Sequence, residues 1–258
     1  MTYFVICGVA FLTSGLTFFS GFGLGTLLLP AFALFFPVEQ AVTMTAVVHF
    51  LNGLFKLVLV GRHANMAILL RFAVPAVIAS LIGAGLLIGL SGVQPLMRYT
   101  VFGHVAEVTP LKLMVGGLLF VFALAEVVPR TRDLSFSARW LPIGGALTGF
   151  FGGLSGMQGA LRSAFLVRTG LSKQAFIATG AVVATLIDMS RLAVYVPMLT
   201  GASGETDYVL LGGAVLAALA GAYLGSRFLT SITMAGVRVI VACMLFLVAL
   251  GVVSGVLA

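Results

Sequence analysis

Residues 152–159 read GGLSGMQG and interrupt an apolar run that extends from Trp140 to Val167. A similar stretch, GFGLG at residues 21–25, interrupts the first apolar run of the chain, Tyr3 to Phe36. As a single α-helix, that first run would measure roughly 50 Å, which is too long for one membrane span and too short for two spans with a turn. Each run is therefore predicted to form two shorter helices that enter and leave the bilayer by the same face.

The composition of the chain excludes a water-soluble domain. Of the 258 residues, 61% are hydrophobic and 8% are charged, and the mean hydropathy is +1.21. Soluble domains carry about 25% charged residues. The sequence therefore predicts an all-α, multi-pass protein of the lipid bilayer. Its net charge of +7 lies mainly in short loops, which indicates membrane orientation and no binding of nucleic acid.

Eight apolar segments are predicted, four on each side of a polar linker at residues 130–139. They are Tyr3 to Phe36, Ala41 to Val60, Met66 to Leu90, Leu111 to Val128, Trp140 to Val167, Phe176 to Leu199, Tyr208 to Leu229 and Val237 to Val256. A shift of 134 residues places Gly15 on Gly149 and Thr45 on Thr179. An internal duplication explains these matches, with chance matching of Gly, Ala and Leu as the alternative. Residues 1–129 and 140–258 are thus predicted to be two transmembrane repeats.

Loop charges test the prediction that each broken segment returns to its starting face. With this topology, one face carries nine loop Lys or Arg residues and the other carries Arg98 and Lys112. The nine are Arg62, Arg71, Arg130, Arg132, Arg139, Arg168, Lys173, Arg227 and Arg238. Such a bias marks the cytoplasmic face, whereas a single crossing by each broken segment would give no bias. We therefore expect residues 130–139 in the cytoplasm, both termini outside, and two inverted repeats, as in many transporters.

A glycine-rich break inside the membrane leaves backbone N–H and C=O groups that lipid cannot satisfy, so both breaks are expected at the protein centre or along a cavity. Helices that begin near Thr26 and Gly159 would present N–H groups and positive dipole ends, which suit an anion. Close packing is the alternative role of the glycines, and it is favoured for Gly221 and Gly225. The predicted substrate-binding residues at the breaks are Ser20, Gly23, Gly25, Thr26, Ser155, Gln158 and Gly159.

Polar residues within the second apolar segment are a further functional signal, because a charge at mid-bilayer costs at least ~2.5 kcal/mol. His49, Asn52 and Lys56 share one helical face, and Thr45 extends this stripe by one turn. All four are predicted to bind substrate. A histidine at this depth either forms hydrogen bonds within the protein core or takes part in substrate binding or proton coupling.

The equivalent helix of the second half carries Thr179, Asp188 and Arg191, which are predicted to face the first stripe. Asp188 and Arg191 have the spacing of an ion pair on one helix. Arg162 adds a positive charge one turn after the second break. These four residues are predicted to bind substrate as well. The alternatives are a purely structural Asp188–Arg191 pair, and arginine side chains that snorkel to the inner face, as Lys56 would also do.

The two halves resemble the TauE/SafE family of sulfite and organosulfonate transporters. The similarity rests on Gly21 to Gly25, Leu29-Pro30 and Val38 to Thr45 in the first half, and on Gly152 to Gly159 and Gly170 to Gly180 in the second half. Essentially the whole chain is covered. The resemblance implies movement of small anionic sulfur compounds, such as sulfite or sulfoacetate, across a bacterial inner membrane.

The function predicted from these features is secondary transport of a small sulfur-containing anion, with no cofactor and no enzymatic activity. Transport of a carboxylate or a metal ion is the alternative, and a membrane-embedded enzyme is a weaker one because no catalytic motif is present. The direction of transport stays open. An inside-negative potential drives anion export, whereas uptake needs a coupling proton or ion, for which His49 and Asp188 are candidates. A homodimer also stays open.

Overall fold

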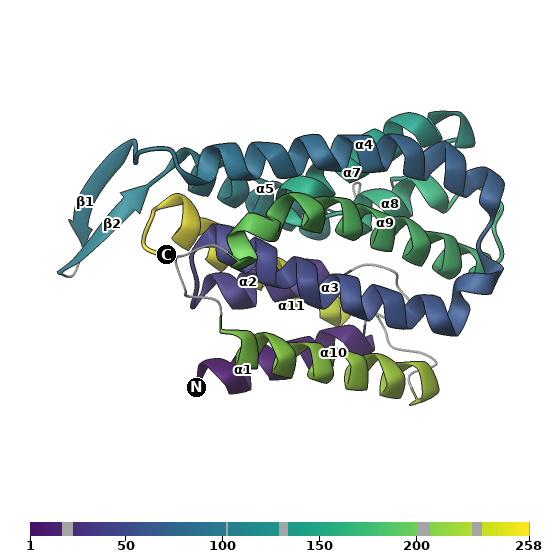
Figure 1. The fold of residues 1–258 in the computed structure, drawn as a ribbon, viewed down its shortest axis with the longest axis horizontal. Helices are drawn as coiled ribbons and strands as arrows, with labels where there is room; N and C mark the ends of the chain where they lie inside the picture. The colour runs from purple at the N-terminus through teal and green to yellow at the C-terminus, as the bar shows by residue number, and fades with distance from the viewer. Residues whose placement is uncertain (17–22, 102, 129–133, 201–206, 229–233, 258) are drawn as a thin grey trace.

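The computed structural model describes residues 1–258 except 17–22, 102, 129–133, 201–206, 229–233 and 258. The described residues form a bundle of long helices with a β-hairpin that projects from one end (Figure 1). The elements, in chain order, are α1 (Thr2–Leu16), α2 (Leu24–Ala33), α3 (Val38–Val60), η1 (Gly61–His63), α4 (Met66–Ser91), β1 (Met97–Val101), β2 (His104–Val108), α5 (Pro110–Val127), η2 (Ala138–Trp140), α7 (Leu141–Ser155), α8 (Gly159–Leu166), α9 (Lys173–Thr200), α10 (Tyr208–Phe228) and α11 (Met234–Val253).

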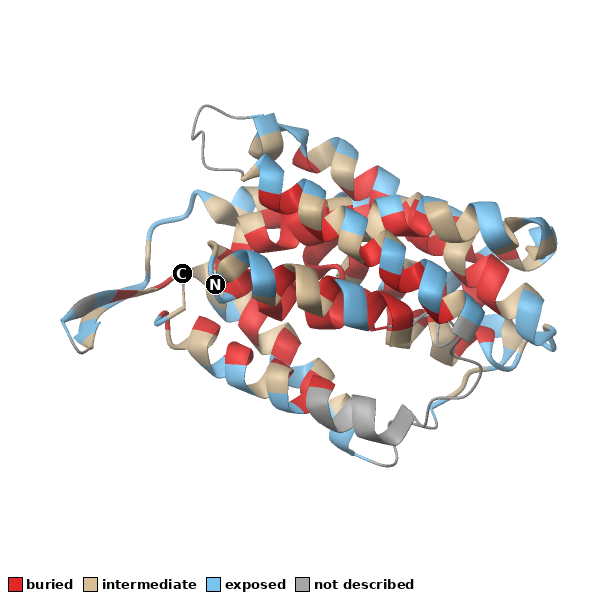
Figure 2. Ribbon diagram, turned by 90° about the horizontal axis from the view of Figure 1, so that it is seen from below, coloured by how far each residue is buried: buried red, intermediate tan, exposed pale blue. Residues whose placement is uncertain are grey.

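The outer surface of the bundle is apolar, as expected of a protein dissolved in lipid. Val58, Ile82 and Leu247 are 84%, 61% and 71% exposed. Figure 2 shows buried residues where helices face one another and exposed residues along the outward faces. Among the described helices, five are long and apolar enough to cross a membrane. The prediction of an all-α, multi-pass membrane protein is confirmed.

The first segment of each half is broken, as the glycine-rich stretches predict. Helices α1 and α2 replace the first apolar run, and helices α7 and α8 replace the fifth. Gly23, at the start of α2, has φ 115°, and Gly156, at the end of α7, has φ 79°. Both values lie in the left-handed region that glycine adopts at little cost. Ser20 and Gly21 lie outside the described residues.

Each broken segment begins and ends at the same end of the bundle. Both chain termini and the hairpin lie at one end (Figure 1). Pro37, which follows α2, lines a surface pocket there with Arg98 of the hairpin. At the opposite end, Leu141 of α7 and Leu166 of α8 pack with Leu69 at the start of α4. The α1–α2 and α7–α8 pairs therefore enter the bundle from opposite ends.

The two halves are interleaved rather than side by side. Helix α1 packs against α10, α4 packs against α7, α3 packs against α9 and α5 packs against α11. Under the predicted duplication, α1 corresponds to α7 and α4 corresponds to α10, so the first two contacts are equivalent. Each half thus supplies one partner to every one of these helix pairs, and neither half encloses a core of its own.

Glycines bring the paired helices into backbone contact. A Cβ placed on Gly149 of α7 would lie 1.9 Å from the Ala76 carbonyl oxygen of α4, and Gly145 and Gly153 face the same helix equally closely. On α10, a Cβ on Gly221 would lie 2.1 Å from the Phe11 carbonyl oxygen of α1. The packing role predicted for Gly221 is confirmed. Small residues allow this close approach where lipid gives no hydrophobic drive for helix association.

The β1–β2 hairpin is absent from the sequence-based prediction, which assigned residues 91–110 to a loop. The strands are antiparallel, and Arg98 Nε lies 2.9 Å from Glu107 Oε1 across them. The turn uses Gly103 with φ 81°, and the Tyr99 hydroxyl donates to the Ser254 carbonyl after α11. Strand-forming residues are present, but a stretch this short between apolar helices gives a weak signal.

Substitution of Gly149 tests the close packing of α4 and α7. We expect Gly149→Ala to lower stability by about 1–3 kcal/mol, because the new methyl group forces the two backbones apart. The matched control is Gly117→Ala on α5, where a Cβ meets nothing within 4 Å. Alanine there should leave stability equal or slightly higher, since it favours the helix. Thermal unfolding in detergent measures the stability of both variants. Equal unfolding temperatures for Gly149→Ala and Gly117→Ala would contradict the packing role of Gly149.

Candidate functional site

The two breaks meet in the interior of the bundle. A Cβ placed on Gly25, in the first turn of α2, would lie 3.1 Å from the Gly156 carbonyl oxygen at the end of α7. The same Cβ would lie 3.6 Å from His49 Cδ2 on α3. The two pairs of short helices therefore touch through glycine backbone, and the histidine of the predicted polar stripe lies beside this contact.

Asp188 on α9 is the centre of the polar interactions near the breaks. Its side chain is 0% exposed, and its Oδ2 lies 2.5 Å from His49 Nδ1. Its Oδ1 accepts hydrogen bonds from Arg191 Nε (3.0 Å) and from Gln158 Nε2 (3.0 Å). Gln158 precedes α8, so one carboxylate ties α3, α9 and the second break together. The predicted contact between the two stripes is confirmed at His49 and Asp188, and the predicted Asp188–Arg191 pair is present.

Arg191 is buried completely, with 0% exposure, and its guanidinium points toward the second break. A Cβ placed on Gly156 would lie 2.7 Å from Arg191 Nη1, which leaves room for glycine alone at this position. Nη2 lies 2.8 Å from Asp188 Oδ1 in an ion pair, and Nη1 has no hydrogen-bond partner among the residues that the structure describes. A buried donor such as Nη1 is ready to bind an acceptor.

Snorkelling does not explain the two arginines. Arg191 has no exposed surface, and Arg162 on α8 is 4% exposed. Arg162 Nη1 donates to Gln158 Oε1 (3.1 Å), so its guanidinium turns inward, toward the break. Snorkelling requires that the charged group reach water at the membrane surface. That alternative is therefore wrong for both side chains.

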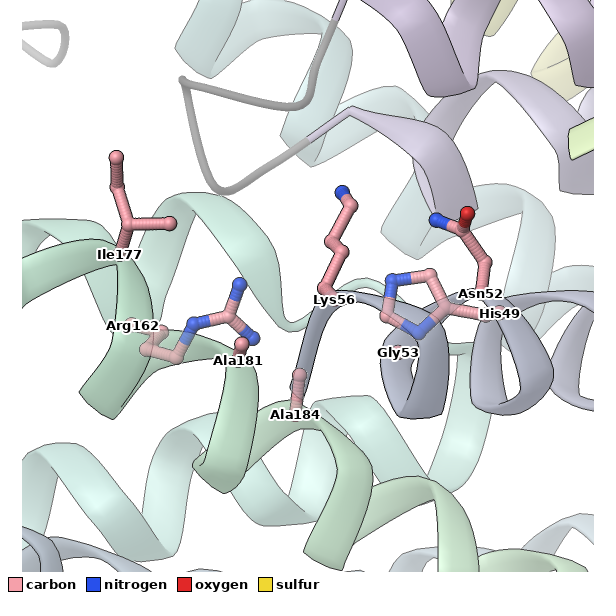
Figure 3. Close-up of a pocket in the computed structure, with 8 residues that line it drawn as sticks. All are labelled: His49, Asn52, Gly53, Lys56, Arg162, Ile177, Ala181 and Ala184. Carbon is pink, nitrogen blue, oxygen red and sulfur yellow. The ribbon is translucent and has the colours of Figure 1, made fainter. Parts of the chain in front are cut away.

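A small cavity lies between α3, α8 and α9, beside the hydrogen-bonded cluster around Asp188. Its volume is about 30 Å³, enough for a water molecule or two. Figure 3 shows Lys56, His49 and Asn52 from α3 on one side of it and Arg162 on the other. The lining residues are His49, Asn52, Gly53, Lys56, Arg162, Ile177, Ala181 and Ala184.

Positively charged side chains are concentrated around this cavity. Lys56 and Arg162 line it, and Arg191 lies nearby in an ion pair with Asp188. Among the described side chains that line the cavity or contact its lining, Asp188 is the acidic one. Buried charge of one sign is costly without a counter-ion. The site is therefore suited to an anion.

The other predicted residues of the breaks already form local hydrogen bonds. The Thr26 hydroxyl donates to the Gly23 carbonyl (2.9 Å), and the Ser155 hydroxyl donates to the Phe151 carbonyl (3.0 Å). Gly159 begins α8 directly after Gln158. Both hydroxyl oxygens retain acceptor capacity. Neither hydroxyl hydrogen is available to an oxyanion unless these bonds break.

The remaining stripe residues have different surroundings. Asn52 Oδ1 accepts a hydrogen bond from the Ser14 hydroxyl of α1 (3.0 Å). Thr45 Oγ1 is buried, with no hydrogen-bond partner among the described residues. Thr179 Oγ1 accepts from the Asn65 backbone N–H (2.9 Å), which holds the turn before α4. Thr179 thus stabilises one end of the bundle and lies nine residues before Asp188, away from the contact between the breaks.

Sequence reasoning missed two residues that support the site. Ser14 orients Asn52, and the Tyr195 hydroxyl on α9 donates to the Gly153 carbonyl of α7, just before the break. Tyr195 lies one turn after Arg191 on the same face of α9, so an extension of the predicted stripe would have found it. Ser14 carried no such signal, because one serine in an apolar helix is common.

Comparison with known proteins identifies the family. Residues 6–252 match the family described as sulfite exporter TauE/SafE. The chain belongs to the TauE/SafE family. The comparison with curated proteins gave no match. TauE/SafE proteins are membrane transporters, so this chain is a multi-pass transporter of a small solute and is not expected to be an enzyme.

Neutralisation of Asp188 tests its place at the centre of the site. We expect Asp188→Asn to destabilise this TauE/SafE protein by about 3–5 kcal/mol, because Arg191 then loses its buried counter-charge. Asp207→Asn is the control, since Asp207 caps α10 at the Leu210 N–H (2.9 Å) and asparagine can cap equally well. Thermal unfolding in detergent compares them. An Asp188→Asn midpoint equal to that of the control would contradict the assignment.

Proposed function

We propose that this TauE/SafE protein is a secondary transporter of small sulfur-containing anions, such as sulfite, sulfoacetate or other organosulfonates. The observation that carries the proposal is the concentration of positive side chains, with Lys56 and Arg162 lining the cavity and Arg191 beside the second break. A tetrahedral or pyramidal oxyanion would offset this charge and accept several N–H bonds at once. The family description, sulfite exporter, supports a sulfur oxyanion as the guest.

Two groups of donors would hold the anion. Lys56, Asn52 and Arg162 line the cavity itself. Arg191 Nη1 lies beside Gly156 of the second break, the residue that Gly25 contacts. The cavity has room for about one or two waters, so entry of a sulfonate requires the two breaks to move apart. Glycine at both positions leaves no side chain to obstruct that movement.

The arrangement of the helices supports alternating access between two inverted repeats, residues 1–129 and 140–258. Equivalent helices pack crosswise, and the two broken segments enter from opposite ends of the bundle. Movement of the α1–α10 pair against the α4–α7 pair would open the site to one end at a time. The excess of loop Lys and Arg favours a cytoplasmic linker at residues 130–139 and external termini, with the protein in a bacterial inner membrane.

A metal ion is a poorer fit to the site than an anion. No group of three His, Cys, Asp or Glu side chains able to hold a metal was found in the part of the chain that the structure describes. The cations around the cavity would also repel one. A carboxylate remains the chemical competitor of a sulfonate, because both are anions with equivalent acceptor oxygens.

Transport into liposomes tests the proposal. We expect the reconstituted protein to move labelled sulfite or sulfoacetate along an imposed gradient, and Arg162→Gln to reduce the rate at least about tenfold, because the site loses a buried positive charge. Arg168→Gln, an exposed position six residues further on, is the matched control and should keep the original rate.

Acetate and a divalent cation serve as competing substrates in the same assay. Transport of acetate in preference to both sulfur anions would replace the proposed substrate class with carboxylates. Transport of the cation alone, or equal losses in Arg162→Gln and Arg168→Gln, would overturn the proposal.

A further inference from the structure

His49 connects the buried carboxylate of Asp188 to the cavity. Its Nδ1 lies 2.5 Å from Asp188 Oδ2, its side chain is 16% exposed, and the ring lines the cavity beside Lys56 and Asn52 (Figure 3). Because Nδ1 faces Asp188, Nε2 is the ring nitrogen left to exchange a proton with water in the cavity. The histidine therefore lies between a group that stabilises its charged form and the place where substrate is expected.

We propose that His49, held by Asp188, binds one proton together with each anion, so that anion transport is coupled to protons. This inference rests on the proposed anion site. Histidine is the residue type that most readily gains or loses a proton near neutral pH. The two oxygens of Asp188 have separate roles, since Oδ1 accepts from Arg191 and Gln158 while Oδ2 faces His49. The carboxylate can therefore stabilise the imidazolium and keep its contact with the arginine.

The charges around His49 make proton binding depend on the anion. Lys56 on the same helix, Arg191 on α9 and Arg162 on α8 oppose a further positive charge, and Asp188 is the described side chain that favours it. Protonation of His49 would add one positive charge to this cluster. An anion in the cavity offsets this repulsion. By linkage, proton binding must then strengthen anion binding by the same factor.

Among the residues that the structure describes, the other elements packed against α3 place no charge near His49. Helix α2 contains no ionisable residue. The charged side chains on the other packed helices and on the turn after α3 lie near the ends of those elements or are exposed. They are Glu39, Arg62, Arg71, Lys112, Glu126, Lys173 and Arg227. The proton-dependent charge of the site is therefore assigned to His49 and its immediate neighbours.

Calorimetric titration of the purified wild-type protein with sulfoacetate tests the coupling. Sulfoacetate keeps a constant charge between about pH 5.5 and about pH 8.5, a range that includes the ordinary pKa of histidine. Sulfite does not keep a constant charge over this range. We expect affinity to fall by up to about tenfold per pH unit above the pKa of the proton-binding site. Titrations in buffers of different ionisation enthalpy should show uptake of about one proton per anion at alkaline pH.

His49→Gln should bind sulfoacetate with an affinity that does not change with pH and without proton uptake. His63→Gln, in the turn after α3, is the matched control and should behave like the wild type. Proton uptake that persists in His49→Gln would overturn the inference and point to Lys56. Binding by the wild type without proton uptake would also overturn it, whether or not the variant folds. Absence of sulfoacetate binding at every pH would instead count against the proposed function.

Discussion

A carboxylate without access to water must be neutralised and hydrogen-bonded, and Asp188 meets both requirements with groups from separate parts of the chain. His49 comes from α3, Arg191 comes from the same helix as Asp188, and Gln158 comes from the second break. The carboxylate therefore fixes the position of the break relative to α3 and α9. It also holds Arg191 with its terminal nitrogens beside Gly156, where a side chain of any size would displace them.

Glycine has two distinct roles in this TauE/SafE protein. Gly23 begins α2 and Gly156 ends α7, each with a positive φ angle, inside the bundle. The N–H and C=O groups left free at these helix ends must be buried in protein, because lipid cannot bind them. At Gly149 and Gly221, the missing side chain allows two helix backbones to touch. The first role breaks the helices at the candidate site, and the second brings paired helices into close contact around it.

The site combines strong positive charge with very little room. Lys56 and Arg162 line a cavity of about 30 Å³, and Arg191 lies beside the second break at Gly156. Positive side chains this close together would suit the proposed anion, and a volume this small would correspond to an occluded form of the proposed site. A transporter needs such an arrangement between its two open states. In the proposed alternating-access cycle, the crosswise helix pairs, α1 with α10 and α4 with α7, would be the units that move.

The sequence by itself determined the membrane class, the helix boundaries to within a few residues, the two breaks and the polar stripe of α3. These features follow from composition and from periodicity along the chain, which are local properties. Only the tertiary structure decided that Gly25 touches Gly156, that His49 pairs with Asp188, that Thr179 holds a distant turn, and that both arginines point inward. Each of these contacts depends on how helices distant in sequence pack against one another. The hydropathy of a helix does not indicate which helix it packs against, because lipid solvates all apolar helix faces equally well.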